Sequence, residues 1–349
     1  GRDRYREELA TLAAGSGGAL RVTETPQPPP SGVVFLPRDA GAEALERRPP
    51  PAAIPRDWGV TSYSGLAAGR AEGAEHPDRD EGTAPPAPVL DPAPRPQADI
   101  FAFPRGARAG TCLHAILEEL EFPAAGGGTL ETVTEKQLRA HGFDSDWTQA
   151  VAANLTGVLS APLLGDPLPG APEFQLGDLQ GADRLTELEF HLPLGRVTPE
   201  GLASCLAPGP DLPPELAAAS APLGFRPLRG LLKGFVDLVF RHRGRYYLLD
   251  WKSNHLGDRV EQYGPDALAR AMGEHHYHLQ YLLYAAALHR YLGRRLPAYR
   301  YADHFGGAVY VFLRGVDPSG RHGIFRARPT EARVEALARY LETGESGHG

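Results

Sequence analysis

Two aspartates and a lysine stand in parts of the sequence that are otherwise apolar. Asp237 lies within the run 235–239, and Asp250 ends a second apolar run, with Lys252 two residues later. Carboxylates brought close together repel each other, and a bound divalent cation such as Mg²⁺ relieves that repulsion because it prefers oxygen ligands. A lysine beside the cation would orient or activate water and stabilise a phosphate. These residue types therefore predict metal-assisted hydrolysis of a phosphate ester.

A β-hairpin is the element that would bring the three side chains together. Residues 234–240 predict a strand, 241–245 a polar turn and 246–252 the returning strand. Side chains two apart in a strand share a face, so Asp250 and Lys252 should point the same way. The returning strand should also lie beside Asp237.

The periodicity around this hairpin predicts an α/β domain with a central mixed sheet flanked by helices. Helices are expected from Gly110 to Leu120, over 147–159, over 266–291 with Gly293 as the stop, and over 330–341; strands are expected over 185–192 and 308–313. The Pro- and Ala-rich residues 199–222 are interpreted as a variable insertion.

Composition excludes several classes of protein. The 349 residues are 42% hydrophobic and 23% charged, which suits a soluble chain with a substantial core, and no apolar run is long enough to span a membrane. Two cysteines, Cys112 and Cys205, are too few for a disulfide scaffold or a four-cysteine metal centre, and they predict a reducing cytoplasm. The net charge of −7 hides a basic stretch: residues 226–259 hold eight Lys plus Arg against three Asp, a net of +5.

The acidity is concentrated in a different segment. Residues 68–99 hold three Arg against seven Asp plus Glu, a net of −4, and they lack aromatic side chains. Such a composition buries too little apolar surface to offset its ordering entropy, so an extended linker is expected there. The predicted organisation is a preceding piece over 1–67, the linker over 68–99 and one α/β domain over 100–349.

An aspartate, a short hairpin and then Asp-x-Lys form the core signature of the PD-(D/E)xK nucleases, which this chain resembles. The surrounding sequence is more specific and is similar to the nuclease domain of the RecB family. The matching stretches are 58–66, 110–114, 233–242, 244–254, 256–257, 279–284 with 287–291, and 304–307 through 312–317. The resemblance extends over nearly all of the chain from about Asp57 onward.

The resemblance implies a restriction-endonuclease-like fold and a Mg²⁺-dependent deoxyribonuclease that processes DNA double-strand breaks for homologous recombination. It implies, by position, the metal ligands His114, Asp237 and Asp250, the motif lysine Lys252, a further acid at Glu189, and the Gln-x-x-x-Tyr pair Gln280 and Tyr284. Spacing alone puts the last two on one helical face, where they could line a DNA channel.

The same resemblance implies the partners: single- and double-stranded DNA, the RecC and RecD subunits of a helicase–nuclease complex, and the recombinase RecA, with no membrane. Because no Gly-x-x-x-x-Gly-Lys-Ser/Thr phosphate loop occurs, ATP-driven unwinding is expected from sequence outside this chain. Residues 1–67 are accordingly expected to be the end of a helicase region, and the chain to be a C-terminal piece or a separately encoded nuclease.

Plainer interpretations compete with several of these assignments. A lone helical histidine such as His114 usually packs or faces solvent, Glu189 could be an edge-strand acid, and Gln280 with Tyr284 could form an ordinary amphipathic face. His275, His276 and His278 are expected on a solvated or DNA-facing surface rather than around a metal. Arg241, Arg243 and Arg245 could form a solvated turn or attract phosphates.

Three other functions are alternatives to this one. Related nucleases of the AddB and Cas-four kind carry an iron–sulfur cluster, which two cysteines cannot hold. A catalytically silent nuclease-like module would only bind DNA or partner subunits, although the intact Asp237, Asp250 and Lys252 argue against it. A stand-alone endonuclease on the same core would differ from an exonuclease by cutting circular single strands.

Overall fold

The computed structural model describes residues 2–23, 57–67, 99–165, 173–219 and 223–345. The chain divides into two compact units, Gly1–Ile54 and Pro55–Gly349. Helix α1 (Arg2–Gly15) belongs to the first unit, and every other element named below belongs to the second. The predicted linker lies outside the described residues except for Asp99.

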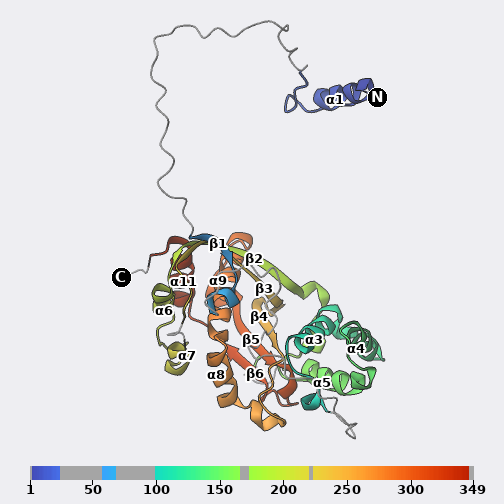
Figure 1. The fold of residues 1–349 in the computed structure, drawn as a ribbon, viewed down its shortest axis with the longest axis vertical. Helices are drawn as coiled ribbons and strands as arrows, with labels where there is room; N and C mark the ends of the chain where they lie inside the picture. Colours follow the sequence, from blue (N-terminus) through green and yellow to red (C-terminus); the bar gives the residue numbers. More distant parts are fainter. Residues whose placement is uncertain (1, 24–56, 68–98, 166–172, 220–222, 346–349) are drawn as a thin grey trace. The chain divides into compact units, whose positions relative to one another are not determined.

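One mixed sheet organises the second unit (Figure 1). The long strand β3 (Leu228–His242) pairs antiparallel with β2 (Arg184–Val197) and β4 (Arg245–Lys252), and parallel with β1 (Trp58–Thr61). Strand β5 (Phe305–Phe312) lies parallel to β4, and β6 (Ile324–Ala327) runs antiparallel to β5. The predicted α/β class with a mixed sheet is confirmed.

The sheet is buried on both faces. Helices α3 (Ala107–Glu119), α4 (Thr129–Ala140) and α5 (Thr148–Ser160) cover one face, and α8 (Pro265–Glu274), α9 (Tyr277–Arg295) and α11 (Glu331–Thr343) lie on the other (Figure 1). Burial on both sides explains why β3 and β4 are continuously apolar rather than alternating. Isolated polar side chains in these strands therefore stand out.

Short helices complete the unit. They are α2 (Tyr63–Ala67), α6 (Pro199–Cys205), α7 (Pro214–Ala218) and α10 (Tyr301–His304), with 3₁₀ turns such as Ile100–Ala102 and Val260–Tyr263. The expected insertion contributes to the core, because Leu202, Leu206, Leu212 and Leu216 are buried. None of the described helices combines the length and the apolar character needed to cross a membrane.

The predicted hairpin is confirmed, with a tighter turn than expected. Strands β3 and β4 are joined by Arg243 and Gly244 alone, and both residues have positive φ, 49° and 77°. Positive φ at both central residues is what a two-residue turn needs to match the twist of the paired strands.

Strand β1 precedes the segment 68–99 in sequence, yet it joins the sheet that follows that segment. Trp58 to Thr61 pair in parallel with Arg229 to Leu232 of β3. Gly230, with φ 136°, permits the contact, because a Cβ there would lie 1.9 Å from the Gly59 carbonyl oxygen. The division at residues 67 and 99 stays a prediction, but 58–61 are part of the sheet.

Two helix predictions were wrong. The single helix expected over 266–291 is two helices, α8 and α9, separated at His275 and His276, where His276 has φ 55°. Gly273 lies in the last turn of α8, just before the break, and the Tyr63 hydroxyl donates a hydrogen bond to the His275 carbonyl from a distant part of the sequence. Helix α9 also continues past the expected stop at Gly293 and ends at Arg295.

Helix α3 begins at Ala107, three residues before the expected entry at Gly110. Gly110 instead lies inside the helix against the loop that follows β4: a Cβ at this position would come within 2.8 Å of Ser253 Oγ. The glycine therefore marks close packing of α3 on the Asp-x-Lys segment rather than a helix start. The helix expected over 147–159 corresponds to α5, whereas α4 was not predicted.

Candidate active site

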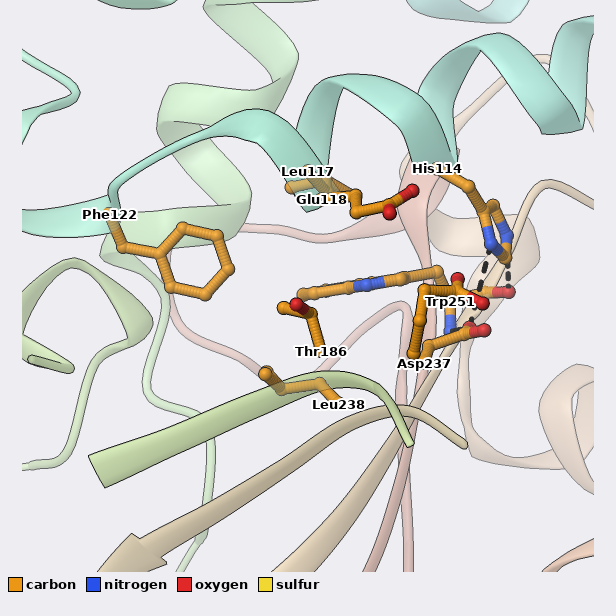
Figure 2. Close-up of a pocket in the computed structure, with 9 residues that line it drawn as sticks. His114, Leu117, Glu118, Phe122, Thr186, Asp237, Leu238 and Trp251 are labelled. Carbon is orange, nitrogen blue, oxygen red and sulfur yellow. Dashed lines mark hydrogen bonds and ion pairs between the residues drawn. The ribbon is translucent and has the colours of Figure 1, made fainter. Parts of the chain in front are cut away.

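A small pocket opens where α3, β2, β3 and β4 meet (Figure 2). Its volume is about 10 Å³, room for a single ion or water. Among the described residues, His114, Glu187 and Asp237 form a group whose ligand atoms all lie within 4.8 Å of one another. A nitrogen and two carboxylates that converge in this way can hold a divalent cation.

His114 is oriented by the backbone of β4. It lies buried on α3, and its Nε2 donates a hydrogen bond to the Trp251 carbonyl oxygen at 3.0 Å. Since a carbonyl oxygen can only accept, the proton lies on Nε2, and Nδ1 is the ligand atom. Nδ1 faces Asp237 Oδ2 at 3.6 Å, longer than a hydrogen bond (Figure 2).

Asp237 is oriented by the same residue of β4. Regular pairing between β3 and β4 extends from His242–Arg245 to Leu238–Leu249, next to Asp237. There the Asp237 carboxylate accepts a hydrogen bond from the Trp251 backbone N–H at 2.8 Å. Trp251 therefore holds Asp237 with its N–H and His114 with its carbonyl.

Asp250 and Lys252 form a buried pair. Lys252 Nζ lies 2.6 Å from Asp250 Oδ2, and only 1% of Lys252 is exposed. The spacing correctly predicted that they share a face. Leu248 belongs to the core on the α9 side, whereas Leu249 and Trp251 belong to the core on the α3 side. By alternation Asp250 and Lys252 lie toward α9, and Asp250 is outside the compact group of His114, Glu187 and Asp237.

The structure distinguishes two acids that the sequence places two residues apart. Glu187 belongs to the group with His114 and Asp237, whereas Glu189 is 44% exposed and lies 3.2 Å from Lys233 Nζ and 3.5 Å from His191 Nε2. Glu187 has φ 50°, so β2 is irregular there and the two acids need not share a face. Sequence reasoning missed Glu187; the Glu-x-Glu repeat was the one available signal.

Gln280 and Tyr284 share one face of α9, as their spacing predicts, but both are buried in the core. Gln280 Nε2 donates to the Tyr284 hydroxyl at 3.1 Å, and its Oε1 accepts from the Tyr310 hydroxyl at 3.0 Å. Tyr310 pairs with Asp250 across β4 and β5. In this structure the two residues therefore lie in the core on the α9 side of the Asp-x-Lys strand and do not line an open channel.

The three histidines near the helix break have different surroundings. His275 is exposed and His276 is half-buried, but His278 is completely buried, so the expectation of a solvated face was wrong for it. His278 Nδ1 lies 3.2 Å from the Met272 carbonyl, to which it donates, and burial lowers the pKa of His278 to about 4. None of the three belongs to the ligand group found among the described residues.

Two arginines of the hairpin, Arg241 and Arg245, contact other parts of the protein. Arg241 Nη2 lies 2.6 Å from Asp183 Oδ1, and that hydrogen bond raises the pKa of Arg241. Arg245 Nη1 donates to the Ala302 carbonyl at 3.0 Å. Attraction of phosphates by this turn stays a prediction.

Comparison with known proteins agrees with this geometry. Residues 95–345 match the family model described as PD-(D/E)XK nuclease superfamily. The chain is 41% identical over 304 residues to RecBCD enzyme subunit RecB of Escherichia coli, covering 86% of this chain and 24% of the relative. The same subunit of Mycobacterium tuberculosis is 39% identical over 272 residues, covering 70% and 24%, and that of Haemophilus influenzae 34% over 242 residues, covering 69% and 19%.

The chain spans about a quarter or less of the length of these relatives. The matched residues include α3, β3 and β4, which line the pocket. The mixed sheet flanked by helices agrees with the restriction-endonuclease-like fold of this family. The chain belongs to the PD-(D/E)XK nuclease superfamily, and it matches the nuclease portion of RecB subunits.

Proposed function

We propose that this chain is a Mg²⁺-dependent deoxyribonuclease that hydrolyses DNA phosphodiesters during double-strand-break end processing for homologous recombination. The observation that carries the proposal is the convergence of His114, Glu187 and Asp237 within 4.8 Å, beside the buried pair of Asp250 and Lys252. A histidine and two carboxylates thus line one small pocket, a convergence that core packing alone would not require.

The donor set fits a divalent cation. Carboxylate oxygens are the ligands that Mg²⁺ prefers, and His114 adds a nitrogen that Trp251 holds in position. We assign His114, Glu187 and Asp237 as ligands. Asp250 lies outside this group, and its role as a metal ligand is proposed from the family resemblance alone. When bound, the cation would polarise a phosphoryl oxygen and lower the pKa of a coordinated water.

The chain's own residues would do the remaining work. Lys252 carries an ammonium beside Asp250, where it can bind a phosphate oxygen or orient the attacking water. Trp251 keeps His114 and Asp237 directed at one point through its backbone. Gln280 and Tyr284 are proposed to support β4 from its α9 side. A catalytic role for Glu189 stays a prediction.

The wider setting also belongs to the proposal. The relatives' name describes a subunit of an enzyme complex, so we propose that the chain works with RecC and RecD subunits on single- and double-stranded DNA in the cytoplasm. RecA is a further proposed partner. ATP-driven unwinding would come from sequence outside this chain.

Degradation of linear and circular single-stranded DNA with Mg²⁺ and without ATP tests the activity. We expect wild-type chain to cleave, and Asp250→Ala or a chelator to abolish cleavage. Cutting of the circular strand would identify an endonuclease. A wild type that binds Mg²⁺ and DNA without cutting would support the silent binding module, and one that does not bind Mg²⁺ would overturn the site assignment.

A further inference from the structure

The ammonium of Lys252 lies against aromatic rings as well as against Asp250. Its Nζ is 3.9 Å from the centroid of the Tyr277 ring and 5.5 Å from that of the Tyr310 ring. A cation over an aromatic face is attracted by the ring's quadrupole, most strongly where water is excluded. Only 1% of Lys252 is exposed, so water is excluded from its contact with Tyr277.

Tyr277 is itself held in place by the break between α8 and α9. It is the first residue of α9, and its hydroxyl donates to Asn254 Oδ1 at 3.1 Å. The Asn254 amide nitrogen lies 3.3 Å from His275 Nε2, and the His275 ring stacks on Tyr277 at 5.2 Å and 20°. Asn254 follows Lys252 by two residues, so the ring is tied to the chain that carries the lysine.

We propose that Tyr277 is the positioning residue that fixes the Lys252 ammonium for catalysis, an inference that rests on the proposed nuclease function. A lysine head group ends a flexible four-carbon chain, and a single carboxylate leaves it several orientations. The Tyr277 face defines the side from which the ammonium approaches Asp250. The helix break thus has a function: it turns the first ring of α9 toward the Asp-x-Lys strand.

The Tyr277 ring and its hydroxyl contact different groups. The ring acts on Lys252, whereas the hydroxyl acts on Asn254. Tyr277→Phe keeps the ring and should retain kcat within about threefold of wild type, while Tyr277→Leu should lower kcat about tenfold or more, as expected for loss of a desolvated cation–aromatic contact. Because Tyr277 acts through Lys252, the KM for DNA should change less than twofold in both variants.

A fluorination series is the decisive experiment. Mono-, di- and trifluorinated phenylalanine at position 277 weaken the quadrupole stepwise with little change of shape, so log kcat should fall with each fluorine. The same series at Tyr281 is the matched control, because that ring is also buried and contacts Tyr310, as Tyr277 does, but the Lys252 ammonium lies over Tyr277. Its kcat should stay constant.

An NMR measurement tests the position of the Lys252 side chain without relying on cleavage activity. The ε-methylene protons of Lys252, assigned through Lys252→Arg, should be shifted upfield by the Tyr277 ring current, and Tyr277→Leu should remove that shift. A wild type that cleaves while the position-277 series stays flat would overturn this inference alone. A wild type that shows the shift but does not cleave would overturn the proposed function, and absence of the shift would overturn the positioning.

Discussion

Glu187 and Asp237 come from the paired strands β2 and β3, and ligand oxygens of the two carboxylates lie within 4.8 Å of each other. Glu187 falls between the pairs Thr186–Leu238 and Leu188–Val236, and it has φ 50°. A positive φ is unfavourable for a residue with a Cβ, and such conformations cluster at functional sites. The strained backbone therefore accompanies the convergence of the two acids.

Replacing each acid of the Glu-x-Glu repeat in turn should show which of the two binds the metal. Glu187→Gln is expected to lower Mg²⁺ affinity about tenfold or more and to reduce cleavage in parallel, because a charged ligand is lost. Glu189→Gln is the matched comparison, and a smaller loss of both is expected because Glu189 lies outside the ligand group and is 44% exposed. Calorimetric Mg²⁺ titration measures the affinity, and DNA cleavage assays measure the rate. A larger loss in Glu189→Gln than in Glu187→Gln would identify Glu189 as the acidic ligand instead.

Arg314 is buried and binds four backbone carbonyls. It donates to Ile100, Phe103 and Pro104, at 2.7, 2.9 and 2.6 Å, and to Ser253 at 3.1 Å. Burial lowers the pKa of Arg314 to about 10, still well above neutrality. One side chain thus joins the segment that leads into α3 to the loop that follows Lys252.

Arg314→Met should remove that connection. We expect the free energy of unfolding to fall by about 3 kcal/mol or more, because buried carbonyls lose charge-assisted hydrogen bonds. Arg321→Met, at an exposed arginine, should cost less than about 0.5 kcal/mol. Urea denaturation compares the two; equal midpoints would show that Arg314 does not stabilise the fold.

The Gln280–Tyr310 hydrogen bond offers a double-mutant test. Gln280→Leu or Tyr310→Phe alone should each lower the free energy of unfolding by roughly 1–3 kcal/mol, since each removes one partner of a buried bond. The double variant should cost clearly less than the sum of the single ones. Additive costs in urea denaturation would mean that the two residues are not coupled.

Acid should destabilise the fold through His278. Its pKa is lowered from 6.5 to about 4 in the folded chain because burial disfavours the imidazolium. The unfolded chain therefore binds a proton between these values that the folded chain does not, and stability present above pH 6.5 is lost as pH falls toward 4. The contribution is on the order of 3 kcal/mol. His278→Asn should flatten the dependence of the urea midpoint on pH, and an unchanged slope would contradict this origin.

Much of the architecture follows from local sequence. The apolar strands on both sides of a short polar turn specify the hairpin, and a period of two puts Asp250 and Lys252 on one face. The α5 and β5 regions were also predicted near their observed positions, because their apolar patterns are continuous. Of the stretches that carry the family resemblance, 233–242 and 244–254 lie in and next to this hairpin, and 304–317 includes β5.

The composition of the pocket depended on the tertiary structure. Glu187 rather than Glu189 approaches Asp237, at a residue with a positive φ that no local pattern signals. The division of α8 from α9, and hence the place of Tyr277 over Lys252, involves a hydrogen bond from Tyr63, more than two hundred residues away. Sequence periodicity predicts which side of a helix or strand is apolar. Which polar groups meet depends on how segments distant in the sequence pack together, and no short stretch of sequence contains that information.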